Sequence, residues 1–307
     1  METTNKLPKR RSRNHSSEER VAYLCLIPAF LGLIFLTYLP LLGVLGISMT
    51  NWSGLSKPEF VGLNNYIKLF TVDPYLKDSI IATVYFAFLS VAGSMVYSLF
   101  IAMLLNRKIP ARGFFRAVFY VPFVLPAVAI YVGWSWLYEA NFGFFNFLLS
   151  EMGLNKILFI ADSKYVVPSL SLIAVWLAGN LIVIFLAGLQ NVPSVYHEAA
   201  EMDGANGWNR FWYVTLPNIT PIIFYNLLLS LISNFQVVTP SLVLTNGGPG
   251  NASRFMTYLM YDQAFVNNRL GYAGATTFII FVIIAAFTAV LFKTSNRWIF
   301  YEGGDEK

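Results

Sequence analysis

The chain has 307 residues, of which 56% are hydrophobic and only 12% are charged, and its formal net charge is +5. Soluble domains carry roughly 25% charged residues, so this composition excludes an ordinary soluble protein and indicates a lipid bilayer as the solvent. With one cysteine, Cys25, and two histidines, His15 and His197, the chain cannot build a disulfide framework or a thiol metal cluster, and we expect no metal site.

Six apolar runs follow one another along the chain, each long enough for the roughly 20 residues that cross the hydrocarbon core of a bilayer. They cover residues 21–48, 80–105, 114–138, 167–189, 221–244 and 273–292. Pro122 and Pro126 fall inside the third run, where neighbouring helices can satisfy the freed backbone groups. The sequence therefore predicts an all-α membrane protein with six transmembrane helices.

A polar, basic tail at residues 1–20 precedes the first run. The run is too long for the apolar core of a signal peptide and no small-residue cleavage site follows it, so we expect an uncleaved first helix. With this tail inside the cell, 14 Lys and Arg residues lie on the inner side and seven on the outer side. The inner residues are Lys6, Lys9, Arg10, Arg11, Arg13, Arg20, Arg107, Lys108, Arg112, Arg116, Arg210, Lys293, Arg297 and Lys307.

This excess of inner positive charge predicts that both termini are cytoplasmic. Residues 21–293 then form a transmembrane domain between two cytoplasmic tails, 1–20 and 294–307, and residues 191–219 form an inner loop between the fourth and fifth spans.

Local sequence signals in residues 191–219 predict two short helices. Ser194 after Pro193 indicates a helix start with Ser194 as the N-cap, and Gly204 suits the left-handed residue that ends a helix near Asp203. We expect a second helix to about Val214, and Pro217 to break the chain before the fifth span. The small side chains of Ala199 and Ala200 would let such an element approach a partner closely.

The same loop contains a set of residues at fixed spacing: Glu198-Ala199-Ala200 is followed by Gly204, Val214 and Leu216-Pro217. This pattern resembles the Glu-Ala-Ala motif of the membrane subunits of binding-protein-dependent ABC importers, with valine in place of the usual isoleucine. The resemblance implies a type I importer permease fold in which this loop seats in a groove of a separate ATPase subunit. The residues that would make that coupling contact are Glu198, Ala199, Ala200, Asp203, Gly204, Leu216 and Pro217.

Further segments resemble the sugar-type permeases of this family. Residues 60–66 (Phe-Val-Gly-Leu-Asn-Asn-Tyr) resemble the outer-loop signature of these permeases. Residues 245–249 (Thr-Asn-Gly-Gly-Pro) and 301–303 (Tyr-Glu-Gly) resemble segments of the larger maltose permease type. That type has extra N-terminal spans and a large outer domain, whereas this chain looks like a compact six-span form.

Polar side chains inside the last spans suggest where a solute would pass, because such residues usually face a cavity or a partner helix. The resemblance carries sugar-contacting positions onto Asn180, Ser230, Ser233 and Asn234, and Gln236 lies nearby in the fifth run. The alternative is that these residues only bond neighbouring helices. The aromatic cluster of Tyr131, Trp134, Trp136 and Tyr138 is read as an interfacial belt or, less directly, as a sugar contact.

The function implied is a permease subunit that carries a sugar or oligosaccharide by alternating access. No Gly-Lys pair and therefore no P-loop occurs in the chain, so ATP and Mg²⁺ would bind two partner ATPase subunits and no catalytic residue or cofactor is expected here. The other expected partners are a second, different permease subunit, an extracytoplasmic solute-binding protein and the plasma membrane of a prokaryote, with no nucleic acid.

Three alternatives remain open. The same machinery could import another solute such as glycerol phosphate, although the last three runs contain no mid-membrane Lys or Arg. An ion-coupled transporter or a membrane-embedded enzyme would need charged or titratable groups within the spans, and the apolar runs contain almost none.

Overall fold

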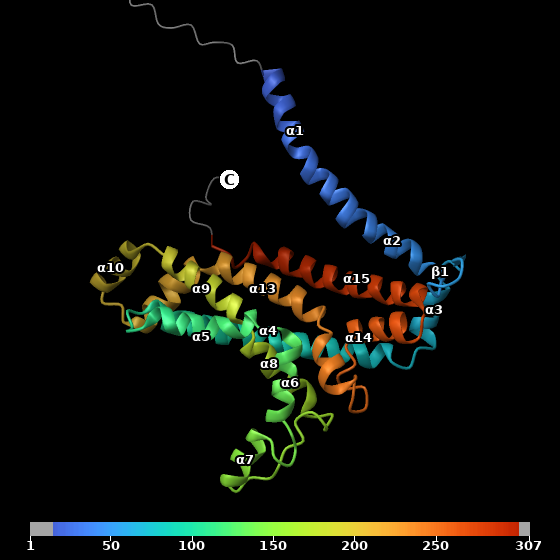
Figure 1. The fold of residues 1–307 in the computed structure, drawn as a ribbon. Coiled ribbons are helices and arrows are strands. Elements are labelled where there is room, and N and C mark those ends of the chain that lie inside the picture. Colours follow the sequence, from blue (N-terminus) through green and yellow to red (C-terminus); the bar gives the residue numbers. More distant parts are fainter. Residues whose placement is uncertain (1–14, 301–307) are drawn as a thin grey trace, which may run out of the picture.

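The computed structural model of the chain describes residues 15–300, with side chains described from residue 22 onward. Within that range the chain is helical almost throughout, and one short antiparallel sheet joins β1 (Thr50–Asn51) to β2 (Glu59–Phe60) (Figure 1). Most of the predicted tails, including residues 301–303, lies outside the described residues.

Three helical stretches are long and apolar enough to cross a bilayer: residues 22–48, 76–106 and 270–295. The first combines α1 (His15–Leu33), η1 (Ile34–Tyr38, a π-helical turn) and α2 (Leu39–Ser48); the others are α4 (Leu76–Asn106) and α15 (Leu270–Ser295). At 1.5 Å per residue, each of them exceeds the ~30 Å hydrocarbon thickness.

Three bent pairs of helices bring the number of candidate spans to six if each pair crosses the bilayer as one. The pairs are α5 (Arg112–Val124) with α6 (Ala127–Leu137), bent by 98°; α8 (Val166–Trp176) with α9 (Gly179–Asn191), bent by 49°; and residues 207–218 with α13 (Thr220–Phe235), bent by 67°. Residues 207–218 comprise α11 (Gly207–Arg210), η2 (Phe211–Thr215) and α12 (Leu216–Asn218). Each of the six predicted runs therefore contains helices, and the all-α membrane fold is confirmed.

The third span differs most from its prediction, because it turns through almost a right angle instead of crossing straight. A proline disfavours the helical conformation of the residue before it, and Leu125 before Pro126 is extended, with φ −68° and ψ 149°. Helix α6 restarts directly after Pro126 and leads away from the bundle toward α7 (Phe144–Glu151) (Figure 1). Pro122, in contrast, lies inside α5 without ending it.

The fifth span ends earlier than residue 244. Helix α13 stops at Phe235, with Gln236 as its C-cap, and π-helical η3 (Ser241–Thr245) follows after a break. The intervening residues are the β-branched Val237, Val238 and Thr239 before Pro240, a combination that disfavours continuing the helix.

The outer connections contain helices that the sequence reading left unassigned. They are α3 (Asn64–Thr71), α7 and the continuous α14 (Met256–Tyr261) and η4 (Asp262–Val266). The segment between η3 and α14 includes a cis peptide bond between Gly248 and Pro249.

Helix α4 is the centre of the bundle and packs against α8, α9 and α13, whereas α2 packs along α15. One face of α4 is a buried polar stripe of Thr83, Ser90, Ser94 and Ser98. Small hydroxyl side chains at helical spacing let neighbouring membrane helices approach closely, and Ser98 donates a hydrogen bond to the Ala178 carbonyl at 3.3 Å.

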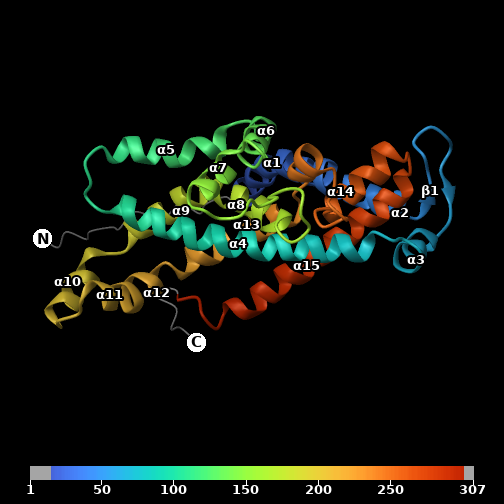
Figure 2. The same ribbon diagram turned by 90° about the horizontal axis from the view of Figure 1, so that it is seen from below.

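The two ends of the bundle carry different structures. Helix α10 (Ser194–Met202), α11 and α12 lie at one end, and β1, α3 and α14 lie at the opposite end in both views (Figures 1 and 2). Helix α1 diverges from the body, and none of the side chains in the most apolar window of residues 22–48 is buried (Figure 1).

Candidate functional site

The predicted coupling loop forms a protruding helical hairpin. Helix α10 contains Glu198, Ala199 and Ala200 and has no buried residue, so this amphipathic element lacks a core of its own. The hairpin extends beyond the ends of the bundle helices (Figure 2). An exposed helix with two alanines on it is available for a groove in another protein.

The turn after α10 depends on Gly204. Its φ of +80° is the left-handed conformation that only glycine adopts without steric cost, as predicted from the sequence. Asn206 then caps α11 by accepting a hydrogen bond from the Asn209 amide at 2.9 Å. An ion pair of 2.9 Å between Glu201 and Arg210 joins the two helices.

Two local predictions in this loop are wrong. Ser194 is the first residue of α10, and Pro193 occupies the N-cap position without a side-chain cap. Pro217 itself does not break the helix, because it lies inside the continuous helical stretch of residues 207–218, which runs on to Asn218. The bend before the fifth span comes instead at Ile219, so Leu216 and Pro217 form the joint between the hairpin and α13.

A cavity of about 220 Å³ opens in the bundle between α4, α8, α9 and α13. Four of the five predicted substrate-path residues line it: Asn180, Ser230, Ser233 and Asn234. Gln236 does not line the cavity, since it caps α13 at an exposed position. Residues 50 positions apart are therefore brought to one wall by the packing of α9 on α13.

The four cavity residues divide into two kinds. Asn234 donates hydrogen bonds to the Ser230 carbonyl at 2.8 Å and to Ser230 Oγ at 3.3 Å. Asn180 and Ser233 make no side-chain hydrogen bond with any described residue and are only partly buried or exposed. Their amide and hydroxyl groups are thus free to bind a polar solute.

The sequence reading missed part of the wall. Phe86 and Ser94 of α4 and Phe123 of α5 also line the cavity. The spacing of Ser90, Ser94 and Ser98 was a readable signal for a polar face on α4.

The four residues of the predicted aromatic cluster have different surroundings. Trp134 stacks on Phe145 at 5.9 Å between ring centroids, and the Tyr138 hydroxyl donates a hydrogen bond to the Ser169 carbonyl at 2.9 Å. Those two rings are packing elements, Trp136 is 70% exposed, and only Tyr131 reaches the cavity.

The bend between α8 and α9 places Asn180 at the cavity. A Cβ atom on the adjacent Gly179 would lie 2.7 Å from the Phe119 carbonyl oxygen and 3.1 Å from Tyr120 Cα. Only glycine allows α9 to approach the α5 backbone this closely.

The cavity and the hairpin are joined by the α9–α13 pair. Near the hairpin, a Cβ atom on Gly188 would lie 2.8 Å from Ile222. Nearer the cavity, the fully buried Asn226 donates a hydrogen bond to the Leu181 carbonyl at 3.4 Å. Helix α9 leads directly into α10, and α13 follows α12, so both ends of the helical hairpin continue into the helices of the cavity wall.

A polar contact fixes the inner end of α5. In the amide orientation that hydrogen bonding favours, the side-chain oxygen of Gln190 accepts from Arg112 Nη2 at 2.6 Å and Arg116 Nη2 at 2.8 Å. Two basic residues of one helix are thus held by the last turn of α9.

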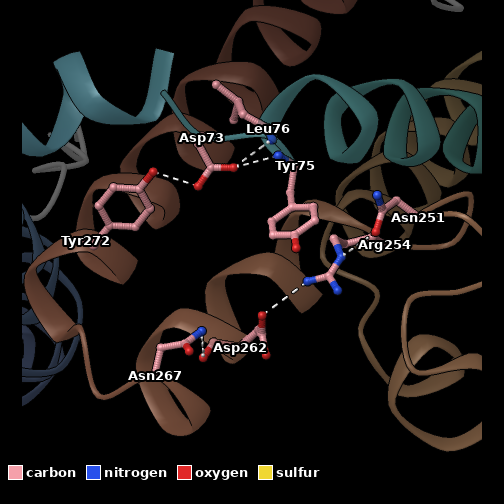
Figure 3. Close-up of polar contacts among 8 residues, drawn as sticks. All are labelled: Asp73, Tyr75, Leu76, Asn251, Arg254, Asp262, Asn267 and Tyr272. Carbon is pink, nitrogen blue, oxygen red and sulfur yellow. Dashed lines mark hydrogen bonds and ion pairs between the residues drawn. The ribbon is translucent and has the colours of Figure 1, made fainter. Parts of the chain in front are cut away.

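At the opposite end, a polar cluster holds the loop after the fifth span (Figure 3). Arg254 pairs with Asp262 at 3.1 Å and lies 4.3 Å from the Tyr75 ring centroid, with side chains of the ion pair only 15% and 21% exposed. Asp73 caps α4 through the Tyr75 and Leu76 amides and accepts a 2.6 Å hydrogen bond from the Tyr272 hydroxyl. This cluster ties together α4, α14 and α15.

The chemistry of the cavity is neutral and polar. Its lining contains amide, hydroxyl and aromatic groups and no charged side chain. Such a surface can hydrogen-bond hydroxyl groups and stack on apolar faces, but it offers no counter-charge for an anion.

Comparison with known proteins adds three findings about the sequence. The profile of the family described as "Binding-protein-dependent transport system inner membrane component" matches residues 94–300. The chain is 34% identical to "Probable ABC transporter permease protein YesP" of Bacillus subtilis, over 97% of each chain. It is 29% identical to "Trehalose/maltose transport system permease protein MalF" of Thermococcus litoralis, over 91% of this chain and 95% of the relative.

A third relative, "sn-glycerol-3-phosphate transport system permease protein UgpA" of Agrobacterium fabrum, is 32% identical over 81% of this chain and 84% of its own. Among solved structures, a chain of a bacterial ABC transporter that imports the acidic polysaccharide alginate superposes with a TM-score of 0.78. The identity is 20%, and the match covers 92% of this chain and 96% of that chain, so it shows a shared fold.

Proposed function

This chain belongs to the inner membrane components of binding-protein-dependent transport systems, and we propose that it is the permease subunit through which an ATP-driven importer carries a sugar or oligosaccharide. The observation that carries the proposal is the connection of an exposed hairpin, α10–α12, to a neutral polar cavity through α9 and α13. One end is suited to receive a partner's motion and the other to bind an uncharged solute.

The coupling role is assigned to Glu198, Ala199, Ala200, Asp203 and Gly204 on the hairpin, with Leu216 and Pro217 at its joint to α13. Two ATPase subunits bind ATP and Mg²⁺ and hydrolyse ATP, and their grooves receive this hairpin and its counterpart. The exposed backbone of α10, with alanines beside Glu198, supports this assignment.

The cavity is the proposed solute-binding site. There the side chains of Asn180 and Ser233, which make no hydrogen bond with a described residue, donate hydrogen bonds to sugar hydroxyls and accept hydrogen bonds from them, and Tyr131 offers an aromatic face. Relatives are named for trehalose and maltose and for sn-glycerol-3-phosphate. A phosphorylated solute would need a basic group, and no Lys or Arg lines this cavity. The neutral lining therefore favours a sugar.

A second permease subunit, a different chain, completes the path, and a binding protein outside the membrane delivers the solute. The N-terminal part of the apolar helix at residues 22–48 supports such a partner, because no side chain in its most apolar window is buried against the described residues. We place the complex in the plasma membrane of a prokaryote, with both termini of this chain inside.

The coupling assignment is tested by Glu198→Lys in the assembled importer. We expect loss of ATPase co-purification and of transport, because a cation replaces the anion at the centre of the docking helix. Glu151→Lys, an equal charge reversal at an exposed position at the end of α7, is the matched control. Normal assembly and transport with Glu198→Lys would remove the hairpin from the coupling mechanism.

The solute assignment is tested by Asn180→Ala across a panel of sugars and sn-glycerol 3-phosphate. We expect the sugar concentration for half-maximal transport to rise while ATPase assembly is unchanged, since Asn180 bonds no described residue. Transport that responds to sn-glycerol 3-phosphate alone would show that the neutral-solute assignment is wrong.

A further inference from the structure

A second polar cavity, of about 250 Å³, lies at the inner end of the bundle, where α4 ends beside the hairpin. Residues of α4, α9, α10, α11 and η2 line it: Met103, Asn106, Arg107, Leu189, His197, Gly207, Arg210, Phe211 and Thr215. It is separate from the cavity around Asn180, with which it shares no lining residue.

Two arginines, Arg107 and Arg210, line this cavity, and its lining contains no acidic residue. Arg107 makes no side-chain hydrogen bond or ion pair with a described residue. Arg210 uses Nη1 for Glu201, whose side chain is 69% exposed, and its other nitrogens bond no described residue. Exposed ion pairs of this kind are weak, so Arg210 can also bind a further anion.

The groups between and around the arginines fit a phosphate ester. Asn106 offers an amide donor and His197 a ring nitrogen on the cavity wall, whereas the Thr215 hydroxyl already donates to the Arg210 carbonyl at 3.4 Å. Arginine is the preferred side chain for binding phosphate oxygens in a forked geometry. The remaining wall, Met103, Leu189 and Phe211, is apolar.

Exposed aromatic rings continue from the cavity along the hairpin. Trp208, Phe211 and Trp212 pack on one another with ring centroids 5.4–6.3 Å apart, yet Trp208 and Trp212 remain 68% and 45% exposed. Tryptophan clusters of this kind occupy the level of the lipid headgroups. The site thus combines two arginines with an exposed aromatic surface of the kind found at the headgroup level.

We propose that this cavity binds the phosphate of an anionic phospholipid headgroup from the inner leaflet, with Arg107 and Arg210 as the two cationic ligands. Basic pockets at the cytoplasmic ends of membrane helices bind such headgroups. The inference rests on the proposed orientation, in which the hairpin end is cytoplasmic. A bound headgroup would join the end of α4 to α11 and stiffen the coupling hairpin.

The test uses the assembled importer in nanodiscs of phosphatidylcholine with and without phosphatidylglycerol, and counts the phosphatidylglycerol retained by native mass spectrometry without ATP or sugar. We expect Arg107→Gln to lower the retention about tenfold, the effect of losing one hydrogen bond to a charged group. Lys108→Gln removes the same charge from the next residue, which is exposed and outside the cavity lining, and should change it far less.

Glu201→Gln provides the opposite change. It releases Arg210 from its ion pair with Glu201, and we expect phosphatidylglycerol retention to rise without any new charge being added to the cavity lining. Size-exclusion profiles of all three variants check that the complex remains assembled.

Equal losses with Arg107→Gln and Lys108→Gln would mean attraction by the general surface charge and would overturn the proposal. The proposal would also be overturned if millimolar inorganic phosphate displaced the bound lipid while Arg107→Gln and Glu201→Gln left phosphatidylglycerol retention unchanged. That result would assign the site to a soluble anion. Because no sugar is present, failure here leaves the solute assignment untouched, and failure of sugar transport leaves this result readable.

Discussion

Replacing Gly179 by alanine tests whether the bend between α8 and α9 positions the cavity wall. The added Cβ atom would lie 2.7 Å from the Phe119 carbonyl oxygen, whereas ordinary van der Waals contact begins at 3.4 Å. The two backbones must therefore separate by about 0.7 Å. Because the obstacle is backbone and not the tip of a flexible side chain, rotamer changes cannot relieve it.

Overpacking of this kind costs ~1–3 kcal/mol. We expect Gly179→Ala to lower the thermal midpoint of the detergent-solubilised complex and to weaken sugar transport more than the stability loss alone explains, since Asn180 is the next residue. Thermal unfolding followed by tryptophan fluorescence and initial rates of sugar uptake in proteoliposomes measure the two effects.

Gly133→Ala is the matched control, because Gly133 lies in α6 and a Cβ atom there meets nothing within 4 Å. That change should be neutral, or slightly stabilising through better helix propensity. If Gly179→Ala is as stable and as active as Gly133→Ala, the close approach of α9 to α5 does not set the shape of the cavity.

Three further predictions concern other parts of the fold. Arg254→Gln should destabilise the outer cluster by about 2–4 kcal/mol, because it leaves the half-buried Asp262 unpaired and removes the stacking on Tyr75; a limited-proteolysis pattern unchanged from wild type would contradict this. Gly204→Ala forces a left-handed alanine at a cost of ~1–2 kcal/mol and should uncouple ATP hydrolysis from transport, whereas Gly153→Ala, equally left-handed but beyond α7, should not. Hydrogen bonds from the Phe142 and Asn141 amides lower the pKa of Glu139. The ionised Glu139 carboxylate therefore stabilises the fold above the ordinary glutamate pKa, and this contribution is lost as the pH falls through the lowered pKa. Glu139→Gln should abolish that part of the pH dependence of the thermal midpoint, and a pH profile identical to wild type would refute this prediction.

Hydropathy predicted where helices lie but not which way they point. The run 114–138 is apolar on both sides of Pro126, so composition alone continues it across the bilayer. The direction is decided by the backbone of Leu125, which the following proline holds extended while α6 restarts at an angle of 98°. The proline at 217 was expected to break the chain, but it lies inside the helical stretch of residues 207–218, and the 67° bend follows at Ile219.

Motif spacing predicted local features better than long-range contacts. The left-handed Gly204 follows from residue type and position. The grouping of Asn180 with Ser230, Ser233 and Asn234 came from a family resemblance, and helix packing brings these residues to one cavity. The contact between Arg254 and Tyr75 could not be predicted, because 179 residues separate them and no local sequence pattern indicates it.

The arrangement of α9 and α13 explains how the two ends of the molecule can act on each other. Helix α9 has 13 residues and is therefore ~20 Å long, with Asn180 in its first turn and the hairpin directly after its last. Helix α13 starts at the hairpin and carries Ser230 and Asn234 in its last two turns.

These helices are held together at Gly188 near the hairpin and at Asn226 near the cavity. A close glycine contact and a buried hydrogen bond resist sliding, so the pair can move as one body when the hairpin moves. The bends flanking it, 49° before α9 and 67° before α13, are the points where rotation costs least. On the proposed function, a displacement at Glu198 would therefore reorient the cavity wall without unfolding any helix.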